Sequence, residues 1–372
     1  MSTVRLAFTG DIGFTRHYKD RVGEDIVDPA LVEFLNDADA AVLNVEGAVA
    51  LPTHAGMFVH TNHPDTVKQF NALNGKIWNL ANNHTMDAEA GGMEETLRHA
   101  KEAGVKTIGA GMNLADAAKP LLLEGAGGIG LFGAVYQRPK KIYGAKPDAA
   151  GCLIDYDKET IQKTVSEIKT SCRWCVMVIH SGSEFLDIPM QCYRDQFREY
   201  LDMGVDVIVA HHPHVPENYE FVDGKPVFYS LGNFIFDTDY QRLQPHTDTG
   251  VLLKLSFTES EVTFEAVGTK IDRTTGKISK APLPDIFVPL TDEDYDALMP
   301  LAGLRFLEHE KRRANYVDPD KLKGFNDEDW IRKWTAEAED GRLVMKDAMD
   351  ERAKFVPGTL DEKYAAIEKY LI

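Results

Sequence analysis

Residues 206–214 read DVIVAHHPH, an apolar run that ends in three histidines within four positions. Short β-branched runs of this kind are typical of buried strands. The end of such a strand is where an open α/β sheet binds its ligands. Because Pro213 donates no backbone hydrogen bond, we expect the strand to end there and a loop to begin. Histidine is the commonest metal ligand, so the imidazoles of His212 and His214 in this loop indicate a metal site.

Further apolar runs predict strands that alternate with helices. We expect strands at 3–10, 40–45, 77–80, 107–111, 129–135, 174–180, 205–211, 226–236 and 250–257, and helices at 91–103, 158–169 and 190–203. This alternation predicts an α/β fold with either two packed sheets or one large mixed sheet. From about residue 290 the sequence becomes helix-rich and highly charged. We therefore predict a sheet domain over residues 1–285 and a helical C-terminal extension over 286–372 that packs on it.

The composition is that of an ordinary soluble globular protein, with 44% apolar and 27% charged residues. The formal charge of −18 argues against nucleic acid and against anionic lipid as partners. No stretch approaches the ~20 apolar residues that span a bilayer, and the N-terminus has no signal-peptide pattern. We therefore expect a cytoplasmic protein without a membrane partner. In that compartment the CxxC at Cys172 and Cys175 is expected to be a pair of reduced thiols rather than a redox couple or half of a zinc site.

Residues able to bind a metal or move a proton recur where the predicted strands end. They are Asp11, Asn44, Glu46, Asn83, His84, His180, His212 and His214. Each of them alone has an ordinary structural explanation, such as a turn, a core histidine or a surface charge. Loops at one edge of a sheet converge on a common site, so their joint occurrence favours a metal site.

Several motifs resemble those of the CapA-type proteins, which are named for poly-γ-glutamate capsule synthesis. The motifs are GDI (10–12), LNVEG (43–47), LANNHTMD (80–87), the strand-end His180, AHHPHV (210–215) and VFYSLGNFIFD (227–237). The resemblance covers about residues 3–257 and leaves out the tail. It implies the calcineurin-like metallophosphoesterase fold, in which two packed mixed β-sheets are flanked by helices.

The resemblance also implies roles for individual residues. Metallophosphoesterases hold two metals about 3.5 Å apart and use a bound hydroxide as the nucleophile. The implied ligands are Asp11 and His214 for the first metal, Asn83, His180 and His212 for the second, and Glu46 in the place of the usual bridging carboxylate. His84 would donate a proton or stabilise charge, and Asp87 would orient it by a hydrogen bond. The residues expected to bind substrate are Asn44, Arg16, His17, Ser230 and Asn233, of which Arg16 and His17 could hold an anion.

The first motif departs from the superfamily pattern. The usual motif is Asp-x-His, whereas residues 11–13 here are Asp-Ile-Gly. Either His17 or another nearby histidine replaces the missing imidazole, or the first site is weak or empty. A mononuclear centre would leave Asp11 and His214 partly free for acid/base work. The sequence therefore leaves open one or two divalent ions, with Mn, Fe, Co or Zn suited to the mixed ligands and Mg or Ca suited to an oxygen-rich first site.

Three functions follow from this site. The favoured one is a metal-dependent hydrolase that acts on a small-molecule or peptide-like substrate, either a γ-glutamyl compound or a phosphoester. The second is a metal-dependent epimerase of a peptide or amino-acid derivative, with Asp11 among its acid/base groups. The third is a non-catalytic scaffold in polymer biosynthesis. The loop that follows Glu46 contains three histidines, His54, His60 and His63. These could grip a substrate, although we favour a plain polar loop.

Overall fold

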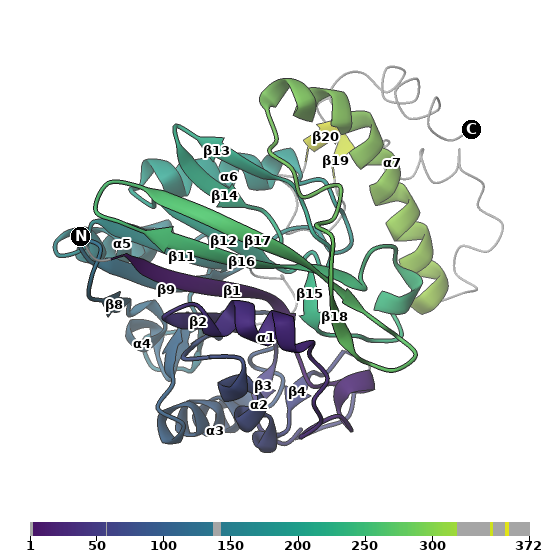
Figure 1. The fold of residues 1–372 in the computed structure, drawn as a ribbon, viewed down its shortest axis with the longest axis horizontal. Coiled ribbons are helices and arrows are strands. Elements are labelled where there is room, and N and C mark those ends of the chain that lie inside the picture. The colour runs from purple at the N-terminus through teal and green to yellow at the C-terminus, as the bar shows by residue number, and fades with distance from the viewer. Residues whose placement is uncertain (1–2, 57, 137–142, 318–342, 345–353, 357–372) are drawn as a thin grey trace.

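The computed structural model of the chain describes residues 3–56, 58–136 and 143–317, together with the short strands β19 (Leu343–Val344) and β20 (Lys354–Val356). Two mixed β-sheets pack face to face, and helices cover their outer faces (Figure 1). This arrangement confirms the predicted α/β class with two packed sheets and excludes the single large sheet.

The larger sheet contains the N-terminal strand near its middle. Across the sheet its strands are β18 (Ile278–Ala281), β17 (Val262–Ile271), β16 (Thr249–Phe257), β1 (Val4–Ile12), β2 (Ala40–Val45), β5 (Ile77–Asn79) and β6 (Lys106–Ile108), and β15 (Asn233–Ile235) also pairs with β1. The run from β1 to β6 is parallel, whereas β16, β17 and β18 form an antiparallel meander. The carboxyl ends of β1, β2 and β5 therefore meet at one edge of the sheet.

The smaller sheet carries the histidine-rich strand at its centre. Its order is β13 (Tyr219–Val222), β14 (Lys225–Phe228), β12 (Val207–His211), β11 (Trp174–His180), β9 (Ile129–Val135) and β8 (Leu121–Leu123). Strands β9, β11, β12 and β14 are parallel to one another. Two minor sheets pair β3 (Ala48–Val49) with β4 (Thr61–Asn62) and β7 (Ala110–Gly111) with β10 (Gly151–Cys152).

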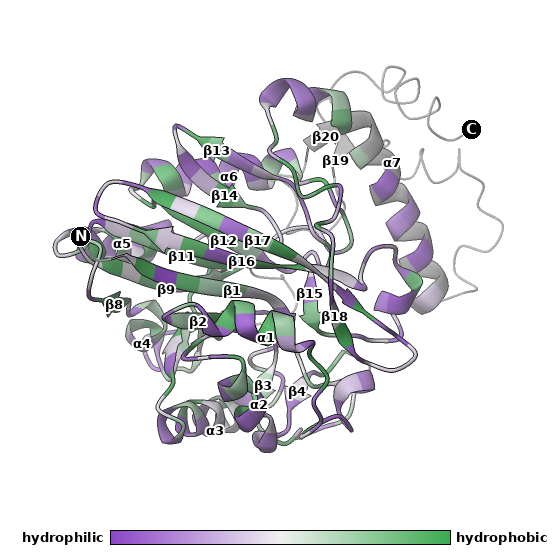
Figure 2. Ribbon diagram, viewed as in Figure 1, coloured by the Kyte–Doolittle hydropathy of each residue, from purple (hydrophilic) through white to green (hydrophobic). Residues whose placement is uncertain are grey.

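The two-residue period of the strands sorts side chains into three apolar layers. Leu6 and Phe8 of β1 pack between the sheets with Val176 and Val209 of the smaller one. The alternate residue Ala7 points instead to the outer face of the larger sheet. Figure 2 shows the green, apolar strands running through the middle of the molecule. Residues at the strand ends that continue the inner face therefore enter the space between the two sheets.

Helices close both outer faces. The larger sheet is covered by α1 (Pro29–Asn36), α2 (Val67–Ala72) and α3 (Glu89–Glu102), and the smaller one by α4 (Leu114–Ala118), α5 (Lys158–Lys169) and α6 (Gln191–Asp202). Asp28 and Asp157 cap α1 and α5, each accepting a hydrogen bond from a backbone N–H of the first turn. Short 3₁₀ turns occur at η1 (Arg16–Tyr18), η2 (Pro64–Thr66) and η3 (Gln241–Leu243).

The long helix α7 (Asp292–Val317) lies within the predicted C-terminal extension of residues 286–372 (Figure 1). It packs on the sheet domain through an ion pair between Arg305 and Asp187 and through contact of the His309 and Phe185 rings, whose centroids lie 5.3 Å apart. Most of that predicted extension lies outside the described residues, and its boundary stays a prediction. Among the described helices, none combines the length and the apolar character needed to cross a membrane.

The sequence expectation of one strand over 226–236 is wrong. The chain forms β14 in the smaller sheet, leaves it, and enters the larger sheet as β15, where Asn233 lies beside Asp11. Gly232 makes this crossing, with a left-handed φ of 68° and its backbone N–H donated to Ser230 Oγ at 3.1 Å. The predicted strand over 107–111 is likewise divided, into β6 and β7.

The crossing predicts a large loss of stability for Gly232→Ala. A Cβ there would lie 2.7 Å from Pro216 Cδ and 2.8 Å from the Thr249 carbonyl oxygen. Gly224→Ala is the matched control, because Gly224 has φ 79° but nothing within 4 Å of an added Cβ. We expect the control to lose about 1–2 kcal/mol from left-handed strain alone. Gly232→Ala should lose ~1–3 kcal/mol more through overpacking. Equal melting temperatures for the two variants would show that the crossing tolerates a side chain.

Candidate metal centre

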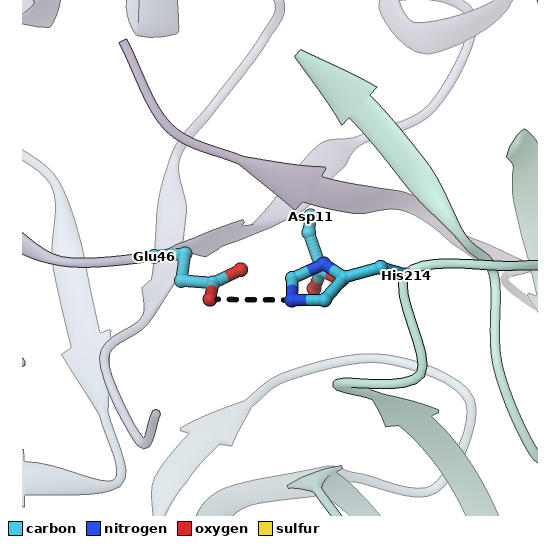
Figure 3. A group of neighbouring side chains, drawn as sticks. All are labelled: Asp11, Glu46 and His214. Carbon is cyan, nitrogen blue, oxygen red and sulfur yellow. Dashed lines mark ion pairs between the residues drawn. The ribbon is translucent and has the colours of Figure 1, made fainter. Parts of the chain in front are cut away.

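Three side chains from three segments meet between the ends of the two sheets (Figure 3). Asp11 lies near the end of β1, Glu46 follows β2, and His214 lies in the loop that follows β12. All three are buried, and one ligand atom from each lies within 4.8 Å of the other two. The structure thus brings together three residues that are far apart in the sequence. Asp11 and His214 are the predicted ligands of the first metal, and Glu46 is the predicted bridging carboxylate.

Direct contacts fix the geometry of this triad. His214 Nδ1 lies 3.0 Å from Asp11 Oδ2, and its Nε2 lies 3.7 Å from Glu46 Oε1. Asn44 donates from Nδ2 to Asp11 Oδ1 at 2.7 Å, and the Asn44 side-chain carbonyl accepts from Asn79 at 2.8 Å. Asp11, Asn44 and Asn79 occupy neighbouring positions on β1, β2 and β5. A row of side chains across three parallel strands therefore holds the aspartate in place.

The Glu46 carboxylate is the feature of the site that most needs a bound cation. The residue is fully buried, and neither carboxylate oxygen has a hydrogen-bond partner among the described residues. Burying such a group without a partner is costly, whereas coordination of a metal satisfies it. Carboxylate oxygens and an imidazole nitrogen converging from Asp11, Glu46 and His214 are a donor set that divalent metals accept. The residues present therefore fit a divalent cation.

The protonation of the triad follows from burial and mutual charge. Burial is the main reason that the pKa of Glu46 rises to about 8, with the neighbouring Asp11 acting in the same direction. Burial also works to raise the pKa of Asp11, but the hydrogen bond and charge of His214 outweigh it and hold that pKa at about 2. Against the effect of burial, Glu46 and Asp11 raise the pKa of His214 to about 9. When no cation is bound, these shifts favour the protonated forms of Glu46 and His214.

The predicted ligands of the second metal lie next to the triad. His180 Nε2 is 2.9 Å from Asn83 Oδ1, and the rings of His180 and His212 have centroids 4.9 Å apart. Asn44 Nδ2 approaches His180 Nδ1 to 3.4 Å, so Asn44 links this group to Asp11. Burial, followed by the nearby His212, lowers the pKa of His180 well below its ordinary value. The imidazole is therefore neutral, which is the form that binds metal.

His84 and Asp87 form the hydrogen-bonded pair expected from the sequence. His84 Nδ1 lies 2.6 Å from Asp87 Oδ2, and His84 Nε2 lies 3.8 Å from Glu46 Oε1. Asn82 fixes this turn to the loop after β2, because its Oδ1 accepts from the backbone N–H of both Gly47 and His84. The imidazole is thereby held with one nitrogen on Asp87 and the other facing the triad.

The loop after β12 is strained where it presents its histidines. His212 and His214 have φ of 101° and 59°, in the region that side chains other than glycine rarely adopt. Such strain persists only where surrounding structure enforces it, and it concentrates at functional sites. The ring of Phe236 stacks on His214, with centroids 5.1 Å apart and planes 14° apart, and supports the strained loop from one side.

Packing explains why glycine occupies position 13, where the superfamily pattern has histidine. A Cβ on Gly13 would lie 2.6 Å from the Phe236 ring and 3.3 Å from the Glu46 carbonyl oxygen. The space is thus filled by the phenyl ring that stacks on His214. His17 does not replace the missing imidazole in this structure, because it lies away from the triad and its Nε2 contacts Asp239 Oδ1 at 2.8 Å.

Two histidines near the centre were not among the predicted metal ligands or catalytic residues. His211 Nδ1 lies 3.6 Å from Asp11 Oδ1, and burial lowers its pKa to about 4, so its imidazole is neutral. Its place at the end of β12, on the inner face with Val207 and Val209, was the signal that could have identified it. His60, for which a plain polar loop is favoured over a substrate grip, is buried, with its ring centroid 4.2 Å from that of His84.

The residues predicted to bind substrate divide into two groups. Asn44, Ser230 and Asn233 are buried and hydrogen-bonded inside the protein, with Asn233 Oδ1 3.0 Å from His214 Nδ1. In this structure they position the ligands and the crossing from β14 to β15. Arg16 and His17 instead line a surface groove of about 620 Å³ beside the centre. A ligand from solution can therefore reach Arg16 and His17, whereas Asn44, Ser230 and Asn233 are buried.

Comparisons with known proteins agree with the motifs. The profile of a family described as "Bacterial capsule synthesis protein PGA_cap" matches residues 5–238. The "PGA biosynthesis protein CapA" of Bacillus subtilis (strain 168) is 31% identical over 244 residues, which cover 63% of this chain and 64% of that protein. The "Capsule biosynthesis protein CapA" of Bacillus anthracis is 29% identical over 250 residues, covering 64% of this chain and 61% of that protein. The chain thus spans less than two thirds of these relatives.

Solved structures overlap with this fold more loosely. A hypothetical protein from Thermus thermophilus has a TM-score of 0.45 at 13% identity, covering 75% of this chain and 100% of that one. A 5'-nucleotidase from Candida albicans has a TM-score of 0.44 at 11% identity, covering 83% of this chain and 58% of that one.

The buried Glu46 predicts a pH dependence of stability in the metal-free protein. Its pKa rises from 4.5 to about 8 on folding, so between these values the folded state holds a proton that the unfolded state has lost. Stability therefore falls as pH rises through this window, by at least about 1.4 kcal/mol between pH 5 and 8, the equivalent of one pKa unit. Urea unfolding at the two pH values measures this loss.

Glu46→Gln is the control for that measurement, since other buried acids such as Glu217 also have a raised pKa. The amide does not titrate, so the variant should lose less stability than the wild type over the same pH range. Identical pH profiles for the two proteins would contradict the assignment to Glu46.

Proposed function

Because the chain belongs to the bacterial capsule synthesis family PGA_cap, whose profile covers residues 5–238, we propose that it is a metal-dependent hydrolase. Its substrate class is a peptide-like, γ-glutamyl compound or a phosphoester, used in the synthesis of a capsule polymer. The observation that carries this proposal is the buried Glu46 carboxylate, which has no hydrogen-bond partner among the described residues and lies beside Asp11 and His214. The names of the Bacillus relatives support the link to capsule polymers.

Asp11, Glu46 and His214 would hold one cation, and Asn83, His180 and His212 would hold a second if two are bound. When present, a divalent cation polarises the scissile group and lowers the pKa of water. The chain's own residues prepare the site for that step. Asn44 fixes the Asp11 carboxylate at 2.7 Å, and the neutral imidazole of His180 is available without loss of a proton.

His84 is placed to serve the leaving group. Its Nδ1 contacts Asp87 Oδ2 at 2.6 Å, which fixes the orientation of the ring. The opposite nitrogen faces the centre, 3.8 Å from Glu46 Oε1. A proton held at Nε2 could then pass to a departing oxygen or nitrogen. The burial of His84 and Asp87 keeps bulk water from competing for that proton.

One observation also favours the second candidate, a metal-dependent epimerase. The Nε2 atoms of His84 and His214 both approach Glu46 Oε1, at 3.8 and 3.7 Å. Two imidazoles facing one small space could act as acid and base on opposite faces of a carbon next to a carbonyl. Uptake of deuterium from heavy water into unhydrolysed substrate identifies this reaction, whereas hydrolysis without exchange excludes it.

Removal of metal tests the proposed class directly. Chelated, metal-free protein should lose at least about 100-fold in hydrolysis of γ-glutamyl peptides or of a nitrophenyl phosphodiester, and added Mn²⁺, Zn²⁺ or Mg²⁺ should restore it. The metal content per chain, measured by elemental analysis, should fall in Glu46→Gln together with activity. Full turnover by the chelated protein would remove the proposal. A chain that takes up no metal from replete medium would point to the scaffold function instead.

Variants of the His84–Asp87 pair should separate chemistry from orientation. His84→Asn should lower kcat by about 10²–10⁴-fold, the usual worth of a general acid. Asp87→Asn should lower it by about 10–100-fold, because the ring loses its orienting partner but keeps its chemistry. His99→Asn on α3 is the matched control and should keep wild-type kcat. An unchanged kcat in His84→Asn would show that the imidazole takes no part in the reaction.

A further inference from the structure

The long helix α7, drawn in light green in Figure 1, meets the rest of the protein through one row of polar and aromatic side chains. These residues recur at intervals of three or four along the chain, so they lie on one side of the helix. At the far end of the row the Tyr316 ring lies 5.0 Å, centroid to centroid, from that of Tyr240. The residues that form this contact face of α7 are Arg305, His309, Arg312 and Tyr316.

The first two residues of the contact face reach the loop between β11 and α6. Arg305 forms an ion pair with Asp187, and the His309 ring lies 5.3 Å, centroid to centroid, from the Phe185 ring. The Phe185 ring in turn stacks on His214 of the triad, with centroids 5.8 Å apart and planes 25° apart. A single phenyl ring therefore separates α7 from a predicted ligand of the first metal.

Backbone contacts hold the Phe185 loop against the loop that carries His214. The Phe185 N–H donates to the Pro213 carbonyl oxygen at 2.7 Å, and a Cβ on Gly182 would lie only 2.7 Å from Pro213 Cγ. Phe185 and His214 both have left-handed φ, of 64° and 59°. Such conformations persist only where the surrounding structure enforces them. Since α7 packs on Phe185, the helix is part of the structure that enforces them.

A second route leads from the contact face to the same imidazole. Arg312 Nε donates to Gln244 Oε1 at 2.7 Å, and the Gln244 backbone N–H donates to the Gln241 carbonyl oxygen at 2.9 Å. The Gln241 side chain accepts from Asn233 Nδ2 at 3.1 Å, and Asn233 Oδ1 lies 3.0 Å from His214 Nδ1. Both routes from α7 therefore end on His214.

We propose that α7 is a positioning element of the metal centre, which holds the strained His214 loop in the form that binds a divalent cation. Phe185 and His309 are then positioning residues, because they act through His214. Docking of the helix and binding of the cation favour each other, since both need the same arrangement of this loop. The inference rests on the metal centre of the proposed function but not on hydrolysis. The helix lies beyond residues 5–238, which the family profile matches, so the family likeness says nothing about it.

Titration of metal-free protein with Mn²⁺, followed by calorimetry, tests this role. Arg305→Ala/His309→Ala removes two contacts to the Phe185 loop and should weaken Mn²⁺ binding by about 5–10-fold. Charge alone predicts the opposite change, because loss of a positive charge lowers the repulsion of a cation. The matched control on α3, Arg98→Ala/His99→Ala, removes the same residue types and the ion pair of Arg98 with Glu102. It should bind Mn²⁺ at least as tightly as the wild type does.

Phe185→Leu tests whether the helix acts through this ring. The substitution keeps an apolar side chain but removes the ring that stacks on His214, so it should weaken Mn²⁺ binding by about 10-fold. Combined with Arg305→Ala/His309→Ala, the loss should be smaller than the product of the two separate losses, because the three residues act through one contact.

Hydrogen exchange provides a readout that does not depend on affinity measurements. Mn²⁺ should slow amide exchange in α7 of the wild type by about 5–10-fold relative to α5, because coupling between two equilibria is reciprocal. The additional protection should disappear in Phe185→Leu. Mass spectrometry of peptides from the two helices measures both effects.

Three results would overturn the positioning role: equal Mn²⁺ affinities of Arg305→Ala/His309→Ala and its α3 control, a combined loss equal to the product of the separate ones, or exchange in α7 that Mn²⁺ leaves unchanged relative to α5. The proposed hydrolase fails on a different measurement. A wild type that binds Mn²⁺ more tightly than the helix variant but cleaves no substrate keeps the positioning role and removes the hydrolase. Metal-dependent turnover with equal affinities removes the positioning role and keeps the hydrolase.

Discussion

The site depends on one buried carboxylate. Glu46 is enclosed between the two sheets with neither oxygen hydrogen-bonded to a described residue, a state that costs free energy until a proton or a cation occupies the space beside it. The elements around it are arranged to supply either one. Asp11 and His214 approach it from two different sheets, and His84 approaches it from the turn after β5. The buried Glu46 carboxylate is thereby placed to bind a cation or a proton.

The fold makes this arrangement possible because its two sheets present the carboxyl ends of their strands to one another. β1, β2 and β5 deliver Asp11, Asn44 and Asn79 in one row, and β11 and β12 deliver His180 and His211 from the facing sheet. Within each of these two sets the strands are parallel to their neighbours. Side chains more than two hundred residues apart in sequence, such as Asp11 and His214, therefore meet without long irregular loops.

Much of the candidate site was predictable from the sequence, since strand-end residues in an α/β fold must converge at a sheet edge. The convergence of Asp11, Glu46 and His214, and the His84–Asp87 hydrogen bond, followed from motif and position. The crossing from β14 to β15 did not, because VFYSLGNFIF is largely apolar and its periodicity carries no sign of a change of sheet. The burial of His60 could not be predicted, because it arises from packing against Phe236 and His84, contacts that only the folded chain makes.

The pairing of β15 with β1 also affects how the chain is synthesised. Asp11 receives its parallel neighbour Asn233 only after more than two hundred further residues have left the ribosome. The antiparallel neighbour β16 arrives later still. Until then β1 is an apolar strand that is paired with β2 on one side only. Its other edge is open, and such an edge is prone to pair with other chains. Asp11 thus lies on an open sheet edge until Asn233 and β16 have been synthesised, and during that interval the edge is accessible to other chains.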